Sequence, residues 1–344
     1  MLKKILFIAS LLSFVNIHAQ ALGGNAAFSF LKQPITTHLA ALGNVNTSQI
    51  GNHIGLAFNN PALLRPEMDE QVNANFNRYF AGINNYSIIS ALHHSKKQFT
   101  HAMGIHFIDY GKLNATDAVG NILGSFSPRD YVIQYSISKK YKEKWIAGIT
   151  AKWISSNYFI YKSNAIATDI GIAYFDSSKQ LQISFLVKNV GSRLQSYQQN
   201  IQKEELPFDV QIGISKKLKN APIQLSITAH QLQNWNLQYQ DTSFNNEQFL
   251  DNKTLSFSEK VFSHLVAAAE IYIKDKIVVS MGYNFLQRRE LSVRNASNGL
   301  NGISGGVSIH LKKIHLQYAT GFFQQNTFNQ LGITFKWNGN ALVK

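Results

Sequence analysis

The chain has 344 residues, a formal net charge of +14, no cysteine and only 15% charged residues. Without cysteine it can build neither a disulfide framework nor a cysteine-based zinc site. Its 12% aromatic content and low charge exclude a disordered chain, so the length suits one large barrel or two soluble domains.

Residues 1–19 are predicted to form a secretory signal peptide. Lys3 and Lys4 precede an apolar run from Ile5 to Val15, and Ala19 lies before the expected cleavage point at Gln20. The apolar run is too short for a helix that spans a bilayer, which argues against a membrane anchor. We therefore expect export into the cell envelope.

Residues 20–69 show no strand pattern and are predicted to form an N-terminal hatch, or plug. A short apolar helix is expected over His38–Leu42, ended by Gly43, and an Asn60-Pro61-Ala62 motif precedes the first strand. A barrel of about fourteen strands has a lumen too wide for wall side chains to fill. This segment could fill it, and an arm outside the barrel in the periplasm is the alternative.

Residues 70–338 repeat a unit of about ten residues in which apolar and polar side chains alternate, and this period of two is typical of strands. In Tyr131–Ser138, the residues Tyr131, Ile133, Tyr135 and Ile137 fall on one face. Fourteen such strands are predicted: 71–79, 83–92, 99–109, 131–138, 145–154, 165–174, 181–189, 208–216, 223–230, 265–273, 277–285, 303–311, 314–322 and 331–337. The expected fold is all-β, a transmembrane antiparallel β-barrel of about 14 strands, followed by a tail over residues 339–344.

The connections support this prediction independently. Every other one is short and carries lysine, as in Lys96-Lys97, Lys139–Lys144 and Lys312-Lys313. Several of the others are long: Tyr110–Arg129, Gly191–Pro207, Leu232–Ser263 and Leu286–Gly302. Outer-membrane barrels have short turns on one rim and long external loops on the other. The positive charge is thus assigned to turns and rims, and no nucleic-acid partner is expected.

No catalytic residue, metal site or cofactor is predicted. Gly302–Gly306 fits G-x-S-x-G but lies at the start of a predicted strand, whereas a nucleophile elbow needs a strand-turn-helix context. His101 and His106 share a hairpin but differ in parity, so they point to opposite faces. Glu270 and Asp169 lie within strands and must face the lumen or a rim; Asp169 is expected to contact the plug backbone.

Two long loops are candidates for docking a partner protein, because exposed aromatic residues among polar neighbours are enriched in interfaces. We expect Tyr110–Arg129 and Leu232–Ser263 to form one docking rim. The candidate residues are Thr116, Asp117, Phe126, Trp235, Tyr239, Phe244 and Phe249.

Several of these stretches carry a family resemblance. Phe28, Phe30-Leu31, Pro34, Ala40–Gly43, Asn60–Leu64, Tyr110-Gly111, Thr116-Asp117, Gly120, Gly124, Phe126 and Leu206–Phe208 resemble the PorQ-like proteins of the type IX secretion system. The wider relationship is to PorV-like and FadL-like barrels, in which fourteen strands enclose an N-terminal hatch that carries an Asn-Pro-Ala motif. The chain departs from many such barrels by running past Trp337 to Lys344 rather than ending on an aromatic residue.

The resemblance implies a non-enzymatic component of the outer membrane. It would anchor a surface attachment complex containing a PorZ-like surface protein, PorU and PorV, which processes secreted cargo and joins it to lipopolysaccharide. Outer-membrane lipid and lipopolysaccharide would be further partners. The alternative is passive transport of hydrophobic small molecules, as the FadL-like relationship implies.

Overall fold

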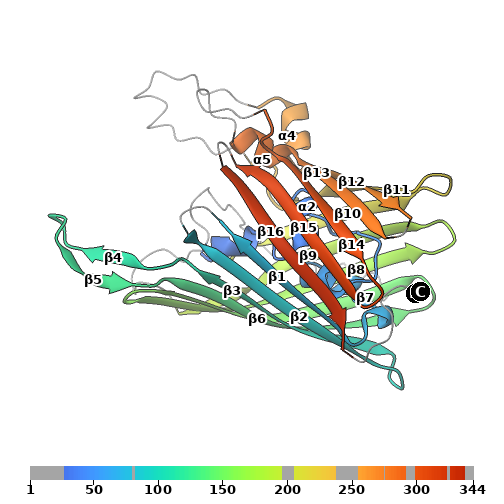
Figure 1. The fold of residues 1–344 in the computed structure, drawn as a ribbon, viewed down its shortest axis with the longest axis horizontal. Coiled ribbons are helices and arrows are strands. Elements are labelled where there is room, and N and C mark those ends of the chain that lie inside the picture. The colour runs from blue at the N-terminus through green and yellow to red at the C-terminus, as the bar shows by residue number, and fades with distance from the viewer. Residues whose placement is uncertain are drawn as a thin grey trace, which may run out of the picture.

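The computed structural model describes residues 27–79, 82–195, 205–237, 255–274, 276–291, 299–323 and 326–337. Fourteen antiparallel strands form a closed barrel, shown in Figure 1, in the order β1-β16-β15-β14-β13-β12-β11-β10-β9-β8-β7-β6-β3-β2. Their bounds are β1 Gln71–Arg78, β2 Asn84–His94, β3 Phe99–Asp109, β6 Arg129–Tyr141, β7 Trp145–Tyr158, β8 Tyr161–Asp176, β9 Leu181–Gln195, β10 Asp209–Lys217, β11 Ile223–Ala229, β12 Leu265–Ile273, β13 Ile277–Asn284, β14 Ile303–His310, β15 Ile314–Phe323 and β16 Asn326–Lys336.

The barrel closes where the first strand pairs with the last. Gln71 lies opposite Lys336, and the antiparallel register continues to Arg78 opposite Asn329. Closure leaves no open sheet edge, and this is the condition a sheet must meet to span a bilayer. The predicted fold class is confirmed, and a strand lies at each of the fourteen predicted positions.

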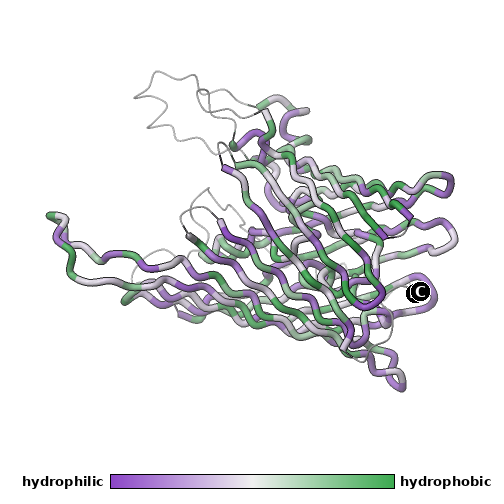
Figure 2. Tube along the Cα trace, in the orientation of Figure 1, coloured by the Kyte–Doolittle hydropathy of each residue, from purple (hydrophilic) through white to green (hydrophobic). Residues whose placement is uncertain are grey.

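The wall is apolar outside and polar inside. Along β6, Ile133 and Tyr135 point outward and are exposed, whereas Gln134 and Ser136 point into the lumen and are buried. Figure 2 shows the same alternation along the strands and hydrophilic residues at the hairpin turns. A water-soluble sheet buries its apolar face, so this inverted arrangement identifies the outer face as the lipid-facing one.

Within the described ranges, no helix has both the length and the apolar character needed to cross a membrane.

The two rims differ as predicted. One carries short turns rich in lysine, such as 142–144 and 311–313, while longer connections lie on the other. The long-loop rim also contains elements that alternation did not predict. A two-stranded hairpin, β4 Leu113–Thr116 with β5 Ile122–Phe126, projects from it, and two short helices, α4 Phe257–Ser263 and α5 Phe285–Glu290, lie beyond the ends of β12 and β13 (Figure 1).

Residues 27–69 run through the lumen from one rim to the other. The segment starts at the long-loop rim, where the Ala27 N–H donates to the Glu205 carbonyl, and it ends at Asp69 beside the short-turn rim. It contains α2 Thr37–Ala41 and the 3-10 turns η1 Ser29–Lys32, η2 Ile54–Phe58, η3 Pro61–Leu63 and η4 Pro66–Met68. The helix expected over His38–Leu42 therefore starts and ends one residue earlier. We call residues 27–69 the hatch segment.

Candidate functional site

The Asn-Pro-Ala motif forms a compact turn pressed against the barrel wall. The Asn60 Oδ1 accepts the Ala62 N–H at 2.9 Å, while the Asn60 Nδ2 donates to the Thr47 carbonyl at 2.8 Å. Pro61 supplies a fixed φ at the first position of η3, where a missing N–H costs nothing. Asn60 thus caps its own turn and ties it to a second part of the hatch segment.

Two glycines in the wall make room for this motif. A Cβ added to Gly148 in β7 would lie 2.5 Å from the Pro61 carbonyl oxygen and 2.8 Å from the Ala62 nitrogen. A Cβ at Gly171 in β8 would overlap the Asn60 side chain. Because the atoms met at Gly148 are backbone, they cannot rotate away. The absence of side chains at Gly148 and Gly171 therefore lets the Asn-Pro-Ala motif pack directly on the backbone of β7 and β8.

Glu270 is a buried charge between the hatch segment and the wall. Its carboxylate lies 2.6 Å from the His38 Nε2 and also accepts a hydrogen bond from Gln49, both in the hatch segment. From the wall, the Tyr272 hydroxyl donates at 2.8 Å and the Ser280 hydroxyl at 3.0 Å. A carboxylate removed from water needs several donors, and here the hatch segment supplies half of them.

A buried ion pair between lysine and aspartate lies within the wall. Asp169 points into the lumen, as predicted, but it contacts Lys152 at 2.6 Å and accepts the Asn189 N–H at 2.8 Å. The expected contact with plug backbone is not made within the described residues of the hatch segment, 27–69. Asn189 has a φ of 58°, and the β8–β9 register shifts between Thr168 and Ile170. The pair supports a β-bulge, where one extra residue leaves an N–H to satisfy.

Most other ties between the hatch segment and the wall are neutral hydrogen bonds. Thr37 donates to Asn75 of β1 at 3.0 Å, Ser48 and Ser215 of β10 share a bond of 2.8 Å, and the Gly43 N–H donates to Ser304 of β14 at 2.9 Å. These anchors lie on widely separated strands. The segment is thus held around the lumen rather than along one side of it.

An apolar pocket of about 310 Å³ lies inside the barrel near the long-loop rim. Phe30 of the hatch segment forms one side, and Ile83, Ile108 and Phe328 belong to the wall around it. Ser29, Gln33, Asn326 and Thr327 are polar residues at its edge. The Tyr79 hydroxyl donates to Gln33 at 3.3 Å, and burial raises the pKa of Tyr79 to about 12, which keeps the phenol neutral. A more polar chamber of about 260 Å³ adjoins the pocket and shares Gln33 and Phe323 with it.

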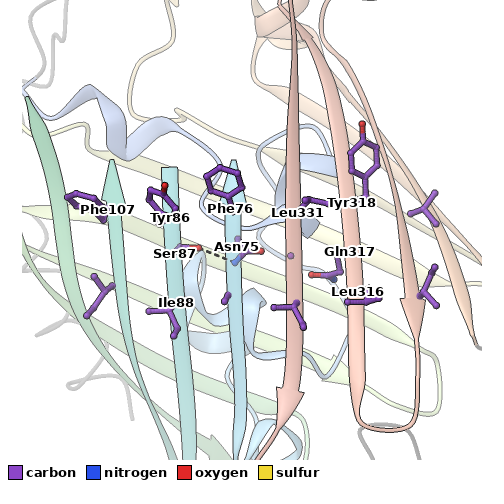
Figure 3. A pocket seen from close by; sticks show the side chains of 16 residues that line it. Asn75, Phe76, Tyr86, Ser87, Ile88, Phe107, Leu316, Gln317, Tyr318 and Leu331 are labelled. Carbon is purple, nitrogen blue, oxygen red and sulfur yellow. Dashed lines mark hydrogen bonds between the residues drawn. The ribbon is translucent and has the colours of Figure 1, made fainter. Parts of the chain in front are cut away.

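A second apolar hollow, of about 650 Å³, lies on the outer, lipid-facing wall over β14, β15, β16, β1, β2 and β3. Figure 3 shows Phe76, Tyr86 and Phe107 side by side on adjacent strands. The Phe76 and Tyr86 ring centroids are 5.1 Å apart. Ala74 of β1 contributes only a methyl group to the floor of the hollow. It shares the barrel sector β15–β16–β1–β2–β3 with the inner pocket.

The candidate docking residues are distributed over two separate places. Thr116 and Asp117 lie at the β4–β5 turn, where hydrogen bonds from Asn121 lower the pKa of Asp117. Phe126 packs on Phe159 at 5.1 Å, and Trp235 packs on Phe257 at 5.7 Å. Tyr239, Phe244 and Phe249 lie outside the described residues. Figure 1 shows the hairpin and α4 well apart on the long-loop rim.

The sequence predicted that Glu270 faces the lumen or a rim, and it faces the lumen, but its partners were not predicted. His38 and Gln49 are separated from it by more than 200 residues, and no local pattern links them. His106 is buried and His101 lies on the opposite face, as their parity predicts. Among the described residues, no group of three or more histidine and acidic side chains is placed to hold a metal ion.

No family model and no curated protein matches the chain. Among solved structures, a deletion mutant of the TodX monoaromatic hydrocarbon channel is 9% identical, covers 87% of this chain and 96% of its own, and gives a TM-score of 0.50. The CymD monoaromatic hydrocarbon channel is 14% identical, with coverage of 90% and 99% and a TM-score of 0.47. A Pseudomonas aeruginosa FadL homologue is 10% identical, with coverage of 88% and 98% and a TM-score of 0.44. At 9% identity the likeness to the TodX structure shows the barrel fold alone.

Proposed function

We propose that the protein is an outer-membrane barrel that binds small hydrophobic molecules at the outer mouth of its lumen and passes them when the hatch segment shifts. The observation that carries this proposal is the apolar pocket bounded by Phe30, Ile108 and Phe328 in a lumen whose buried wall residues are mostly polar. Export through cleavage of residues 1–19 belongs to the same proposal.

The chemistry of the pocket favours an apolar ligand of modest size. Small-molecule sites typically enclose about 300 Å³ or more and combine an apolar lining with few polar groups. The 310 Å³ pocket has that composition, with the Tyr79 hydroxyl at its edge. An aromatic ring or a short aliphatic chain would fit. The TodX structure, described as a monoaromatic hydrocarbon channel, has the same fold and is consistent with this class of ligand.

Binding is tested by filling the pocket. The Ile83→Trp variant should weaken binding of 1-aminoanthracene at least tenfold in lipid nanodiscs, after subtraction of the signal from empty discs. Ile88→Trp is the matched control, because Ile88 lies on the outer wall and should not affect binding. Toluene should compete with the probe. Equal affinity in the two variants would exclude the pocket as the site.

Passage is tested separately by fixing the hatch segment. The Ser48 and Ser215 hydroxyl oxygens are 2.8 Å apart, so cysteines at both positions are placed to form a disulfide in a chain that has no other cysteine. The oxidised double variant should bind the probe but fail to pass it into liposomes, and reduction should restore passage. Equal passage before and after reduction would mean that the route does not need the hatch segment to move.

Anchoring of a surface attachment complex with PorZ-like, PorU-like and PorV-like partners is the second candidate. The β4–β5 hairpin favours it, because Val119, Ile122 and Leu123 expose aliphatic side chains on an element that projects from the rim. Large exposed apolar patches of this kind mark interaction sites. Deletion of residues 113–126 should leave the barrel inserted and release a co-purifying surface protein. Unchanged co-purification would count against this role.

A further inference from the structure

Aromatic side chains extend the lipid-facing wall beyond the end of β13. Met281 and Tyr283 point outward from β13, and the Tyr283 ring lies 4.6 Å from Phe285, the first residue of α5. Phe285 in turn lies 5.2 Å from Phe262 of α4. Phe262 is 49% exposed and Phe257, on the same helix, is 74% exposed. An apolar column therefore runs without interruption from the wall to α4.

The height of this column matches the upper edge of a bilayer. Ile277 begins β13 at the short-turn rim, and Phe285 follows eight residues later. At ~3.3 Å per residue and a strand tilt of ~40°, that separation corresponds to ~20 Å along the membrane normal. The apolar band of an outer-membrane barrel is ~25 Å tall. Phe285 and Phe262 thus lie at the level where hydrocarbon gives way to lipid headgroups.

The residues around the column suit that boundary. Lys260 lies on α4 between Phe257 and Phe262, and Arg288 and Arg289 lie in the last turn of α5. Aromatic rings and long cationic side chains are the groups that settle at membrane interfaces. The capping box between Ser256 and Glu259 and the packing of Phe262 on Phe285 fix α4 in place without covering Phe257.

We infer that α4 is a membrane-interface anchor, whose Phe257 and Phe262 side chains insert into the outer leaflet between acyl chains and headgroups. The occupant of this surface is lipid, because the surface continues the lipid-facing wall. The anchor would hold residues 255–264, which lead into β12, against the bilayer, and this role is independent of any ligand in the lumen.

The test uses the absence of native cysteine. Single cysteines at positions 262, 281 and 96 are labelled with bimane, and the protein is placed in nanodiscs containing phosphatidylcholine brominated at carbons 6 and 7 or at carbons 11 and 12. Met281→Cys is the lipid-facing control and Lys96→Cys, in the β2–β3 turn, is the aqueous control.

For Phe262→Cys we expect quenching of at least half that seen for Met281→Cys, stronger with the shallow bromines than with the deep ones. Lys96→Cys should lose less than a tenth of its signal. A second variant keeps Phe262 and labels Phe257→Cys, which should behave in the same way. If both labels on α4 respond to aqueous iodide and to bromine as Lys96→Cys does, the inference is overturned.

Discussion

A methyl group added at Gly148 should push the Asn-Pro-Ala motif away from the wall and weaken docking of the hatch segment. In Gly148→Ala, the new Cβ would lie 2.5 Å from the Pro61 carbonyl group and 2.8 Å from the Ala62 nitrogen. Ordinary contact begins near 3.4 Å, so the motif must retreat by about 1 Å. Overpacking of this kind costs about 1–3 kcal/mol. If the cost falls on hatch docking, the undocked population rises about 5- to 150-fold.

Cysteine labelling measures that population. Ser48 is fully buried in the hatch segment, and the chain contains no cysteine, so Ser48→Cys gives a single reporter. In folded protein, maleimide should react with it only when the hatch segment undocks. The labelling rate should rise in the Gly148→Ala background by the factor above.

Gly305→Ala is the matched control. Gly305 also lies within a wall strand, β14, but a Cβ there would meet only the Ser280 carbonyl oxygen, at 3.6 Å. Its labelling rate should equal that of the parent. If Gly148→Ala and Gly305→Ala react at the same rate, the cradle formed by Gly148 does not hold the hatch segment and the reasoning fails.

Three further predictions concern the same interface. Asn60→Ala removes the cap of η3 and the hydrogen bonds to Thr47, so it should make hatch docking less favourable by about 1–2 kcal/mol and raise the labelling rate accordingly. An unchanged labelling rate would show that Asn60 is dispensable. Glu270→Ala removes the acceptor of His38 and Gln49, so it should lower the free energy of unfolding by about 3–5 kcal/mol. The midpoint of chemical denaturation should fall, and a midpoint equal to that of the parent would contradict this role of Glu270. Burial, reinforced by His38, holds the pKa of His53 well below 6.5 while the hatch segment is docked, so a proton binds more readily to His53 when the segment is undocked and exposed. Docking should therefore weaken as the pH falls below about 6.5, and His53→Gln should remove that pH dependence of the labelling rate.

The strands were predictable because lipid and lumen impose opposite demands on alternate residues. In β6 the apolar residues Ile133 and Tyr135 face lipid, and the polar residues Gln134 and Ser136 face the lumen. Strand ends that rise above the apolar band lose this contrast. The predicted strand 145–154 continues in the structure to Tyr158 through Ser155, Ser156 and Asn157, which pair with β8 although their sequence does not alternate.

The β4–β5 hairpin and the partners of Asp169 and Glu270 could not be predicted, because the hairpin strands are very short and the partners lie far away in the sequence. The β4–β5 hairpin escaped prediction because Leu113–Thr116 and Ile122–Phe126 are too short to establish a period, and Gly120 and Gly124 suggest an irregular loop. The partner of Asp169 was missed because the bulge at Asn189 brings a backbone N–H to it, and neither strand signals a bulge. Glu270 was expected to face the lumen or a rim and faces the lumen, but the identity of His38 as its partner follows only from the path of the hatch segment.

A barrel sealed in lipid requires that alternate residues of each wall strand face lipid and the lumen. Spin labels at single cysteines placed at each position from 131 to 137 along β6 test this by their accessibility to oxygen, which concentrates in the bilayer, and to a water-soluble nickel chelate. Positions 131, 133, 135 and 137 should show high oxygen accessibility, and positions 132, 134 and 136 should be protected from both reagents. High accessibility of the odd positions to the nickel chelate, or no alternation, would contradict a barrel sealed in lipid around an occupied lumen.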